Sequence, residues 1–356
     1  MNKKTKVLLK IGVLLLLTFL SLYIVFKDDY KEVFKILITS SPLYIILAIA
    51  SMLLVFFIDG CIMTILANLF QKGYKLHQGV LNQQYNVFFN GITPLATGGQ
   101  PFQVYLFKKQ GIHISNGISI IFIYFVLYKV TLLSFATFSF LYNYSHLNSL
   151  IDSSQYNLLF LLIVSFSLIA SLSLLVILIA YLPFFKNLFL KIIVLLGKIK
   201  IIKNVENAQN TFNEKILLIR QNITHIFTNW KTISLLLGLM ILRFFIFYSI
   251  PFITFYAINT PIQGKYFFDS VALASYTSLI SGVFPSPGGS VGVELAYTYL
   301  YKSFFATKLA TIDVNATIKG SLLIWRAITF YLGLILGAVV VLFYKPRKKK
   351  EKTLNL

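Results

Sequence analysis

The chain is poor in acidic residues, in cysteine and in histidine. Its 356 residues include 11 Asp and Glu, one cysteine and four histidines. A single cysteine, Cys61, excludes an internal disulfide, and we expect it to pack inside a helix. The histidines show no metal-ligand spacing, so the sequence predicts no metal site and no cofactor; they are His77, His113, His146 and His225. The phosphate-binding pattern G-x-x-x-x-G-K-[ST] is also absent, which excludes nucleotide hydrolysis by that motif.

Polar residues are scarce throughout. Hydrophobic residues make up 57% of the chain and charged residues 12%, and the mean hydropathy is +0.79. This composition predicts an all-α polytopic membrane protein. A spanning helix needs about 20 apolar residues, and six segments meet this rule: 8–26, 43–70, 117–142, 157–182, 233–258 and 317–343. The first has a basic start like a signal peptide, but no small-residue cleavage site follows, so we interpret it as a retained helix.

Basic residues outnumber acidic ones, with a net charge of +21. Their positions favour a membrane surface over nucleic acid, because they cluster before the first span, in 184–231 and after the last span. By the positive-inside rule both termini are expected in the cytoplasm, with an even number of crossings. Together with a bias toward Lys, Asn, Ile and Phe, this indicates a multi-pass protein of a bacterial plasma membrane.

Two apolar regions, 85–106 and 267–305, are interrupted by proline and glycine. The first lies between the second and third spans, so it would enter the membrane from the cytoplasm and return there. The second lies between the fifth and sixth spans, so it would enter from outside. The sequence therefore predicts two opposed re-entrant broken helices.

The two broken regions share a sequence pattern, "NGITPLATGGQPFQVY" in one and "SGVFPSPGGSVGVELA" in the other. In each a proline is followed within a few positions by Gly-Gly: Pro94, Gly98 and Gly99 correspond to Pro285, Gly288 and Gly289. This favours an inverted repeat, as in transporters whose interrupted helices form the substrate site near the midplane. Chance similarity, or a kink that serves packing alone, is the alternative.

We predict a single membrane domain, 1–356, built from two halves. It divides into a first helix and outer loop (1–42), a first half (43–183), a cytoplasmic amphipathic connection (184–231), a second half (232–344) and a basic tail (345–356). The connection carries an apolar stripe at spacings of three and four, formed by Val205, Ala208, Phe212, Ile216, Ile219, Ile223 and Ile226. This stripe would lie on the inner leaflet or on the underside of the protein itself.

Five charged residues fall within or beside the apolar segments: Asp59, Lys129, Arg243, Glu294 and Arg326. Each costs about 2.5–3.5 kcal/mol if left at the bilayer centre, so we expect inward-facing, paired side chains. Asp59 would pair with Arg243 or Lys129, and Glu294 with Arg326. We expect function for Glu294 and Arg326, whereas Asp59 and Lys129 could lie near helix ends and reach the interface.

Breaking a helix frees backbone N–H groups that the bilayer cannot satisfy unless they line a polar cavity. A half-helix that begins after Gly-Gly would direct these donors at an anionic group such as a lipid phosphate. The predicted substrate-binding residues are Pro94, Gly98, Gly99, Gln100, Pro285, Pro287, Gly288, Gly289, Glu294, Arg326 and Arg243. No catalytic residue is predicted.

Three stretches, "GITPLATGGQPFQVYLFKKQGI", "VFPSPGGSVGVELAY" and "LLIWRAITFYLGLILGA", resemble the hallmark blocks of the lysylphosphatidylglycerol synthase membrane-region family, also called flippase-like or uncharacterised membrane family 0104. By this resemblance ten residues of the chain belong to the family motifs: Pro94, Gly98, Gly99, Pro285, Pro287, Gly288, Gly289, Gly292, Glu294 and Arg326. Relatives commonly carry an acidic and then a basic residue where this chain has Gln100 and Gln103. That departure implies a different choice of substrate.

The resemblance leaves three functions open. One is a transporter or flippase for an anionic or aminoacylated phospholipid, similar to lysyl-phosphatidylglycerol, or for a related polar lipid. The alternative is a phosphatidylglycerol lysyltransferase, linked to resistance to cationic antimicrobial peptides, or the membrane partner of a separate lipid synthase. Residues 344–356 are too few for an aminoacyl-transfer domain, which favours transport. Membrane phospholipids are the expected partners, and no nucleic acid is expected.

Overall fold

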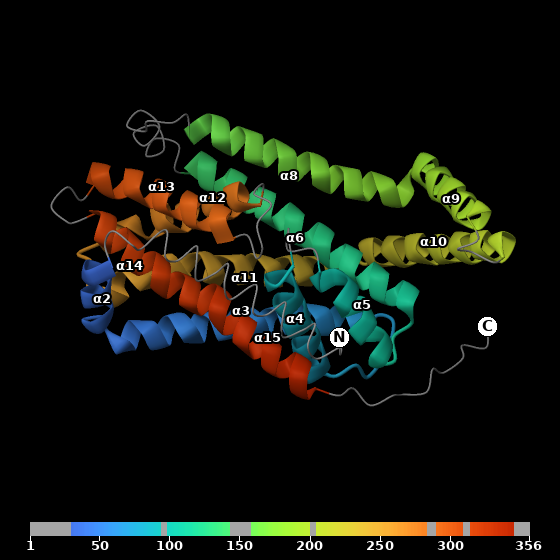
Figure 1. The fold of residues 1–356 in the computed structure, drawn as a ribbon, viewed down its shortest axis with the longest axis horizontal. Coiled ribbons are helices and arrows are strands. Elements are labelled where there is room, and N and C mark those ends of the chain that lie inside the picture. The colour runs from blue at the N-terminus through green and yellow to red at the C-terminus, as the bar shows by residue number, and fades with distance from the viewer. Residues whose placement is uncertain are drawn as a thin grey trace.

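The computed structural model describes residues 30–93, 98–142, 158–199, 204–282, 290–308 and 314–344. Within these residues the fold is helical and contains no strand (Figure 1). The helices are α2 (Tyr30–Ile38), α3 (Pro42–Asn68), α4 (Leu76–Gly91), α5 (Gly99–Lys109), α6 (Ile114–Tyr142), α8 (Leu158–Tyr181), α9 (Pro183–Lys198), α10 (Val205–Thr228), α11 (Trp230–Ala257), η2 (Gly264–Tyr266), α12 (Phe267–Ser281), α13 (Ser290–Lys308), α14 (Val314–Arg326), η4 (Ala327–Tyr331) and α15 (Leu332–Phe343). The predicted first span, 8–26, and the basic tail lie outside the described residues.

Four of the described helices are long and apolar enough to cross a membrane. They are α3, α6, α11 and the continuous helix Val314–Phe343, which runs from α14 through η4 to α15. These confirm the predicted spans 43–70, 117–142, 233–258 and 317–343 to within a few residues. Helix α8 lies on the predicted span 157–182, and its described apolar stretch, Leu159–Leu175, is shorter than the other four. The all-α polytopic class is confirmed.

The starts of the helices follow from local chemistry. Helix α3 begins with Pro42, whose missing N–H costs nothing in the first turn. Helix α10 follows Asn204, whose side chain accepts a hydrogen bond from the backbone N–H of Asn207 at 2.9 Å. Helix α11 is capped in the same way by Asn229. Such caps satisfy donors that a helix end leaves open.

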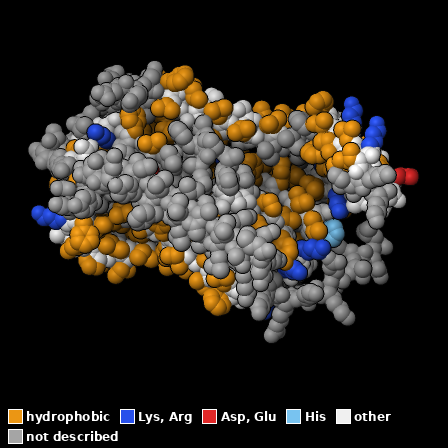
Figure 2. All heavy atoms as spheres, in the orientation of Figure 1, with side chains coloured by type: hydrophobic (Ala, Val, Ile, Leu, Met, Phe, Trp, Pro, Cys, Tyr) orange, Lys and Arg blue, Asp and Glu red, His pale blue; other side chains and the backbone are white. Residues whose placement is uncertain are grey.

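The outer surface is suited to lipid. One side of α3 is buried in the bundle, whereas the other exposes large apolar side chains: Leu43, Ile46, Leu47, Leu53, Leu54 and Phe57. Figure 2 shows apolar side chains along the flanks of the molecule and Lys and Arg side chains toward its two ends. Acyl chains can cover such flanks, and the charged ends can meet water and headgroups.

The first predicted re-entrant region is a helical hairpin made of α4 and α5. At its open end Gln110 Nε2 donates to the carbonyl of Gln78 at 3.1 Å. At its closed end the N–H of Gly99 donates to Asn90 Oδ1 at 2.7 Å, so the two helices run antiparallel. With 16 and 11 residues, they are about 24 and 16 Å long and too short to cross a hydrocarbon core of about 30 Å.

The second predicted region is a hairpin of α12 and α13. The Tyr301 hydroxyl, late in α13, donates to the carbonyl of Ser270, early in α12, at 2.9 Å. Near the open end the rings of Tyr266 and Phe304 lie edge to face, 5.5 Å apart. These contacts make α12 and α13 antiparallel as well.

The two hairpins enter the bundle from opposite ends. Helix α3, which precedes the first hairpin, runs antiparallel to α11, which precedes the second. The N–H of Ser41 at the start of α3 donates to the carbonyl of Ala257 at the end of α11 at 2.7 Å, and the rings of Tyr44 and Tyr256 stack beside it. The order span, hairpin, span therefore occurs twice with opposite direction, as the sequence predicted.

The connection between the halves is formed by α9 and α10. The predicted stripe lies on one side of α10, where Ile223 and Ile226 are buried. Beside them Asn222 Nδ2 donates to Asn116 Oδ1 of α6 at 3.0 Å. The later part of the stripe therefore packs on the protein itself, while the start of α10 extends away from the bundle (Figure 1).

Helices α15 and α4 approach closely at glycines. Gly337 of α15 faces α4, and Gly333, four residues earlier, packs against Phe56 of α3 and Val87 of α4; small residues let helix backbones meet in this way. A Cβ added at Gly337 would lie 2.8 Å from the carbonyl oxygen of Gln84 and 2.8 Å from Phe88 Cβ. A backbone carbonyl cannot rotate away as a side chain can.

We expect Gly337→Ala to destabilise the protein and Gly238→Ala to leave it equally or more stable. A Cβ at Gly238 in α11 meets nothing within 4 Å, and alanine favours a helix over glycine by up to about 1 kcal/mol. Thermal unfolding of both variants in one detergent measures the difference. Equal melting temperatures for the two variants would show that the α4–α15 contact tolerates a methyl group.

Candidate functional site

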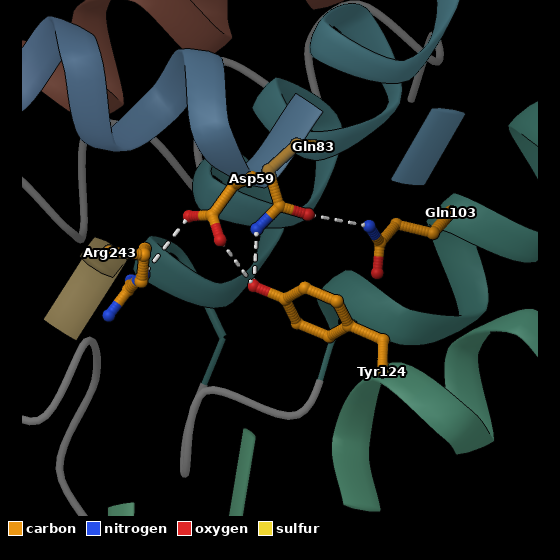
Figure 3. A network of polar contacts seen from close by, with 5 residues as sticks. All are labelled: Asp59, Gln83, Gln103, Tyr124 and Arg243. Atoms are coloured by element: carbon orange, nitrogen blue, oxygen red, sulfur yellow. Dashed lines mark hydrogen bonds and ion pairs between the residues drawn. The ribbon is translucent and has the colours of Figure 1, made fainter. Parts of the chain in front are cut away.

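A buried polar network joins the two halves of the protein (Figure 3). Asp59 in α3 is 2% exposed; its Oδ2 lies 3.4 Å from Arg243 Nε of α11, and its Oδ1 accepts a hydrogen bond from the Tyr124 hydroxyl of α6 at 2.8 Å. That hydroxyl accepts from Gln83 Nε2 of α4 at 3.2 Å. Gln103 Nε2 of α5 donates to Gln83 Oε1 at 3.0 Å. The network thus links the first hairpin to spans of both halves.

The Arg243 guanidinium is also held by aromatic rings. Its Cζ lies 4.9 Å from the ring centroid of Phe244, 5.2 Å from that of Phe247 and 5.5 Å from that of Tyr128. Ring faces attract a cation, most of all where water is excluded. Of the two partners predicted for Asp59, the structure shows Arg243 and not Lys129.

A second ion pair lies in the other half. Arg326 Nε is 3.7 Å from Glu294 Oε1, and each side chain is 5% exposed. This confirms the predicted pairing, although the separation exceeds hydrogen-bond length. Glu294 Oε1 accepts no hydrogen bond from a described residue. The Arg326 guanidinium lies 4.2 Å from the ring centroid of Phe330.

The backbone beside Arg326 is irregular. The helix winds as a π-helix over Ala327–Tyr331, directly after Arg326. Such insertions are frequent at functional sites. No proline or glycine marks this position in the sequence, and the predicted helix 317–343 contained no irregularity.

A chain of hydroxyls fixes the helices that carry this pair. Ser321 Oγ of α14 lies 2.7 Å from the Tyr297 hydroxyl of α13 and 2.7 Å from Thr254 Oγ1 of α11. The Tyr297 ring stacks on Trp325 at 4.9 Å. Tyr297 follows Glu294 by three residues and Trp325 precedes Arg326, so these contacts set the distance between the two charged side chains.

The tip of the first hairpin is built around Gly98 and Gly99. The N–H of Gly98 donates to Thr93 Oγ1 at 2.9 Å, while that of Gly99 donates to Asn90. A Cβ at Gly99 would lie 2.7 Å from the carbonyl oxygen of Asn86, so only glycine fits. Both donors that we expected to face a phosphate are bonded to side chains in this structure, and a phosphate would have to displace those acceptors.

Of the other predicted site residues, one is described by the structure and five are not. Gln100 follows Gly99 in α5 and is half-buried. Five of the predicted site residues lie outside the described residues: Pro94, Pro285, Pro287, Gly288 and Gly289. The structure brings Glu294 and Arg326 together, whereas Arg243 belongs to the separate network on α3 and α11.

Sequence reasoning missed Tyr124, Gln83 and Asn90. A signal for Gln83 was present, because the run "LNQQYN" at 81–86 places amides next to a broken apolar region. A buried amide is costly without hydrogen-bond partners, so such a run indicates a polar network. Tyr124 had no comparable signal, since tyrosine is common in this chain, with 21 residues.

The comparison with protein families agrees with this architecture. The family model described as lysylphosphatidylglycerol synthase TM region matches residues 7–337, which include both hairpins and both ion pairs. No curated protein sequence matches the chain. Since the family model covers most of the chain, the protein belongs to the lysylphosphatidylglycerol synthase transmembrane-region family.

Proposed function

We propose that the protein moves an anionic or aminoacylated phospholipid, or a related polar lipid, across a bacterial plasma membrane. The observation that carries this proposal is the Glu294–Arg326 pair, which is buried, separated by 3.7 Å and placed between a hairpin helix and an irregular span. Membership of the family supports a membrane protein that acts in connection with lysyl-phosphatidylglycerol.

The charges of the pair match a lipid headgroup. Arg326 would bind the phosphate of the lipid, because a guanidinium forms strong charge-assisted hydrogen bonds with phosphate oxygens. Glu294 would then accept a proton or the ammonium group of an aminoacyl headgroup. A pair held at 3.7 Å costs less to separate than one joined by short hydrogen bonds, so exchange with a ligand is feasible.

The opposed hairpins supply a route for movement. In inverted repeats one half rocks against the other around a fixed central site, which opens it to each side in turn. Here α3 and α11 form the antiparallel contact about which the halves would rock. With both termini in the cytoplasm, the open end of the first hairpin would face the cytoplasm and that of the second hairpin the outside.

The test is lipid translocation in proteoliposomes. Vesicles with and without the protein receive headgroup-labelled phosphatidylglycerol or lysyl-phosphatidylglycerol, and a membrane-impermeant reagent reports the label that reaches the outer leaflet. We expect protein-dependent movement of at least one lipid. Absence of movement for both, together with transfer of lysine from lysyl-tRNA to phosphatidylglycerol by the same preparation, would support the lysyltransferase instead.

A further inference from the structure

Lys129 is a cation within a spanning helix and has no acidic partner among the described residues. It lies near the middle of α6, about 20 Å from the nearer end at 1.5 Å per residue, which is farther than a lysine side chain reaches. The prediction that the Lys129 side chain reaches the membrane interface is therefore wrong. No ion pair joins Lys129 to a carboxylate among the described residues.

The surroundings of Lys129 are aromatic. Its Nζ lies 5.8 Å from the ring centroids of both Phe125 and Tyr128. Ring faces stabilise a cation only in part, and a charge inside a membrane segment is costly unless it is paired or functional. The ring contacts position the ammonium group and leave its charge uncompensated.

Arg243 approaches the same tyrosine. Its Cζ lies 5.5 Å from the Tyr128 ring centroid, and it contacts Asp59 through Nε. Figure 3 shows its terminal nitrogens directed away from Asp59. Within the described part of the chain they make no hydrogen bond, and the side chain is 12% exposed. A guanidinium bonded through Nε keeps its terminal donors for another acceptor.

The charges of this cluster do not balance. Asp59 carries one negative charge, whereas Arg243 and Lys129 carry two positive charges around Tyr128. One positive charge remains among apolar helices. Both cations lie within 6 Å of the Tyr128 ring centroid, so a monoanion bound beside that ring would neutralise the excess charge, and hydrogen bonds to it from an ammonium or guanidinium group are the strong, charge-assisted kind.

We propose that Lys129 and the terminal nitrogens of Arg243 form a binding site for the phosphodiester monoanion of a phospholipid headgroup. The inference rests on the proposed lipid transport and adds to it a second phosphate position, separate from Arg326. The site lies on spans α6 and α11, so it joins the two halves. Lipids with a net negative headgroup are its ligands, and zwitterionic lipids bind it weakly because their ammonium group meets the same cations.

The test is binding of short-chain phosphatidylglycerol to the full-length protein in detergent, measured by calorimetry. Short-chain phosphatidylcholine and inorganic phosphate are titrated in parallel. The variants are Lys129→Gln, Lys129→Arg and the control Lys265→Gln. Lys265 is a matched control because it is exposed and its Nζ also lies over a tyrosine ring, that of Tyr266, at 5.0 Å.

We expect Lys129→Gln to weaken phosphatidylglycerol binding at least about tenfold, since a charge-assisted hydrogen bond is lost. Lys129→Arg should bind within about threefold of wild type, and Lys265→Gln should be unchanged. Wild-type affinity in Lys129→Gln would overturn the site. A loss confined to inorganic phosphate would overturn the lipid assignment and identify free phosphate as the ligand.

The result is separable from that of the proposed function. If phosphatidylglycerol binding depends on Lys129 while wild-type vesicles move no lipid, the site stands and transport fails. If wild-type vesicles move lipid while Lys129→Gln binds and moves phosphatidylglycerol normally, transport stands and the site fails. Size-exclusion chromatography of each variant confirms that the folded protein is compared.

Discussion

Removing the charges of Glu294 and Arg326 together is expected to reduce lipid movement at least about tenfold while leaving the protein folded. The double variant Glu294→Gln with Arg326→Gln keeps side chains of similar length, and it leaves no buried charge without its partner. A neutral amide pair cannot hold a phosphate as a guanidinium does, because the charge-assisted hydrogen bonds are absent. Initial rates of labelled-lipid translocation in vesicles measure the effect.

The single variant Arg326→Gln does not separate binding from stability. Arg326→Gln alone leaves the Glu294 carboxylate with a 5% exposed side chain and without its cation, at a cost of about 3–5 kcal/mol. Its loss of transport would therefore mix two causes. Lys302→Gln, on the exposed side of the same helix α13, is the control and should transport normally. Wild-type rates in the double variant would remove this pair from the mechanism.

The ion pairs show which parts of the site the sequence predicts and which it does not. The scarcity of charge made each intramembrane charge conspicuous, and both partnerships were among the predicted ones. Sequence alone left Asp59 with two possible partners, since it does not fix how α3, α6 and α11 rotate about their axes. The antiparallel contact of α3 with α11, seen at Ser41 and Ala257, brings Arg243 beside Asp59.

The hairpins were recognised from proline and glycine, but the first was predicted too short. Its predicted range, 85–106, compares with α4 and α5, which together run from Leu76 to Lys109. The part of α4 that the prediction left out has the sequence "LHQGVLNQQ". Its amide side chains lower the hydropathy, so this stretch resembles a loop in the sequence. It is helical because Gln83 hydrogen-bonds across the hairpin and to α6, and because Gly79 allows close approach to α3.

Arg243→Gln should destabilise the protein by about 3–5 kcal/mol because it leaves the buried Asp59 carboxylate without its cation. Adding Asp59→Asn should restore most of the loss, since an amide can still accept the Tyr124 hydrogen bond. Reversible unfolding in mixed detergent, analysed as a double-mutant cycle, measures the coupling between the two sites. Additive effects would show that the 3.4 Å contact contributes no coupling.

The restored double variant also tests what the network is for. Since it removes the charge that joins α3 to α11, it weakens the contact about which the halves would rock without stranding a carboxylate. If the pair serves only to hold the halves together, the double variant should transport lipid at the wild-type rate once its stability is matched. If Arg243 also binds a phosphate with Lys129, transport of phosphatidylglycerol should fall while the fold persists. Measuring stability and transport for the same two substitutions thus distinguishes an ion pair that only holds the halves together from one that also binds a ligand.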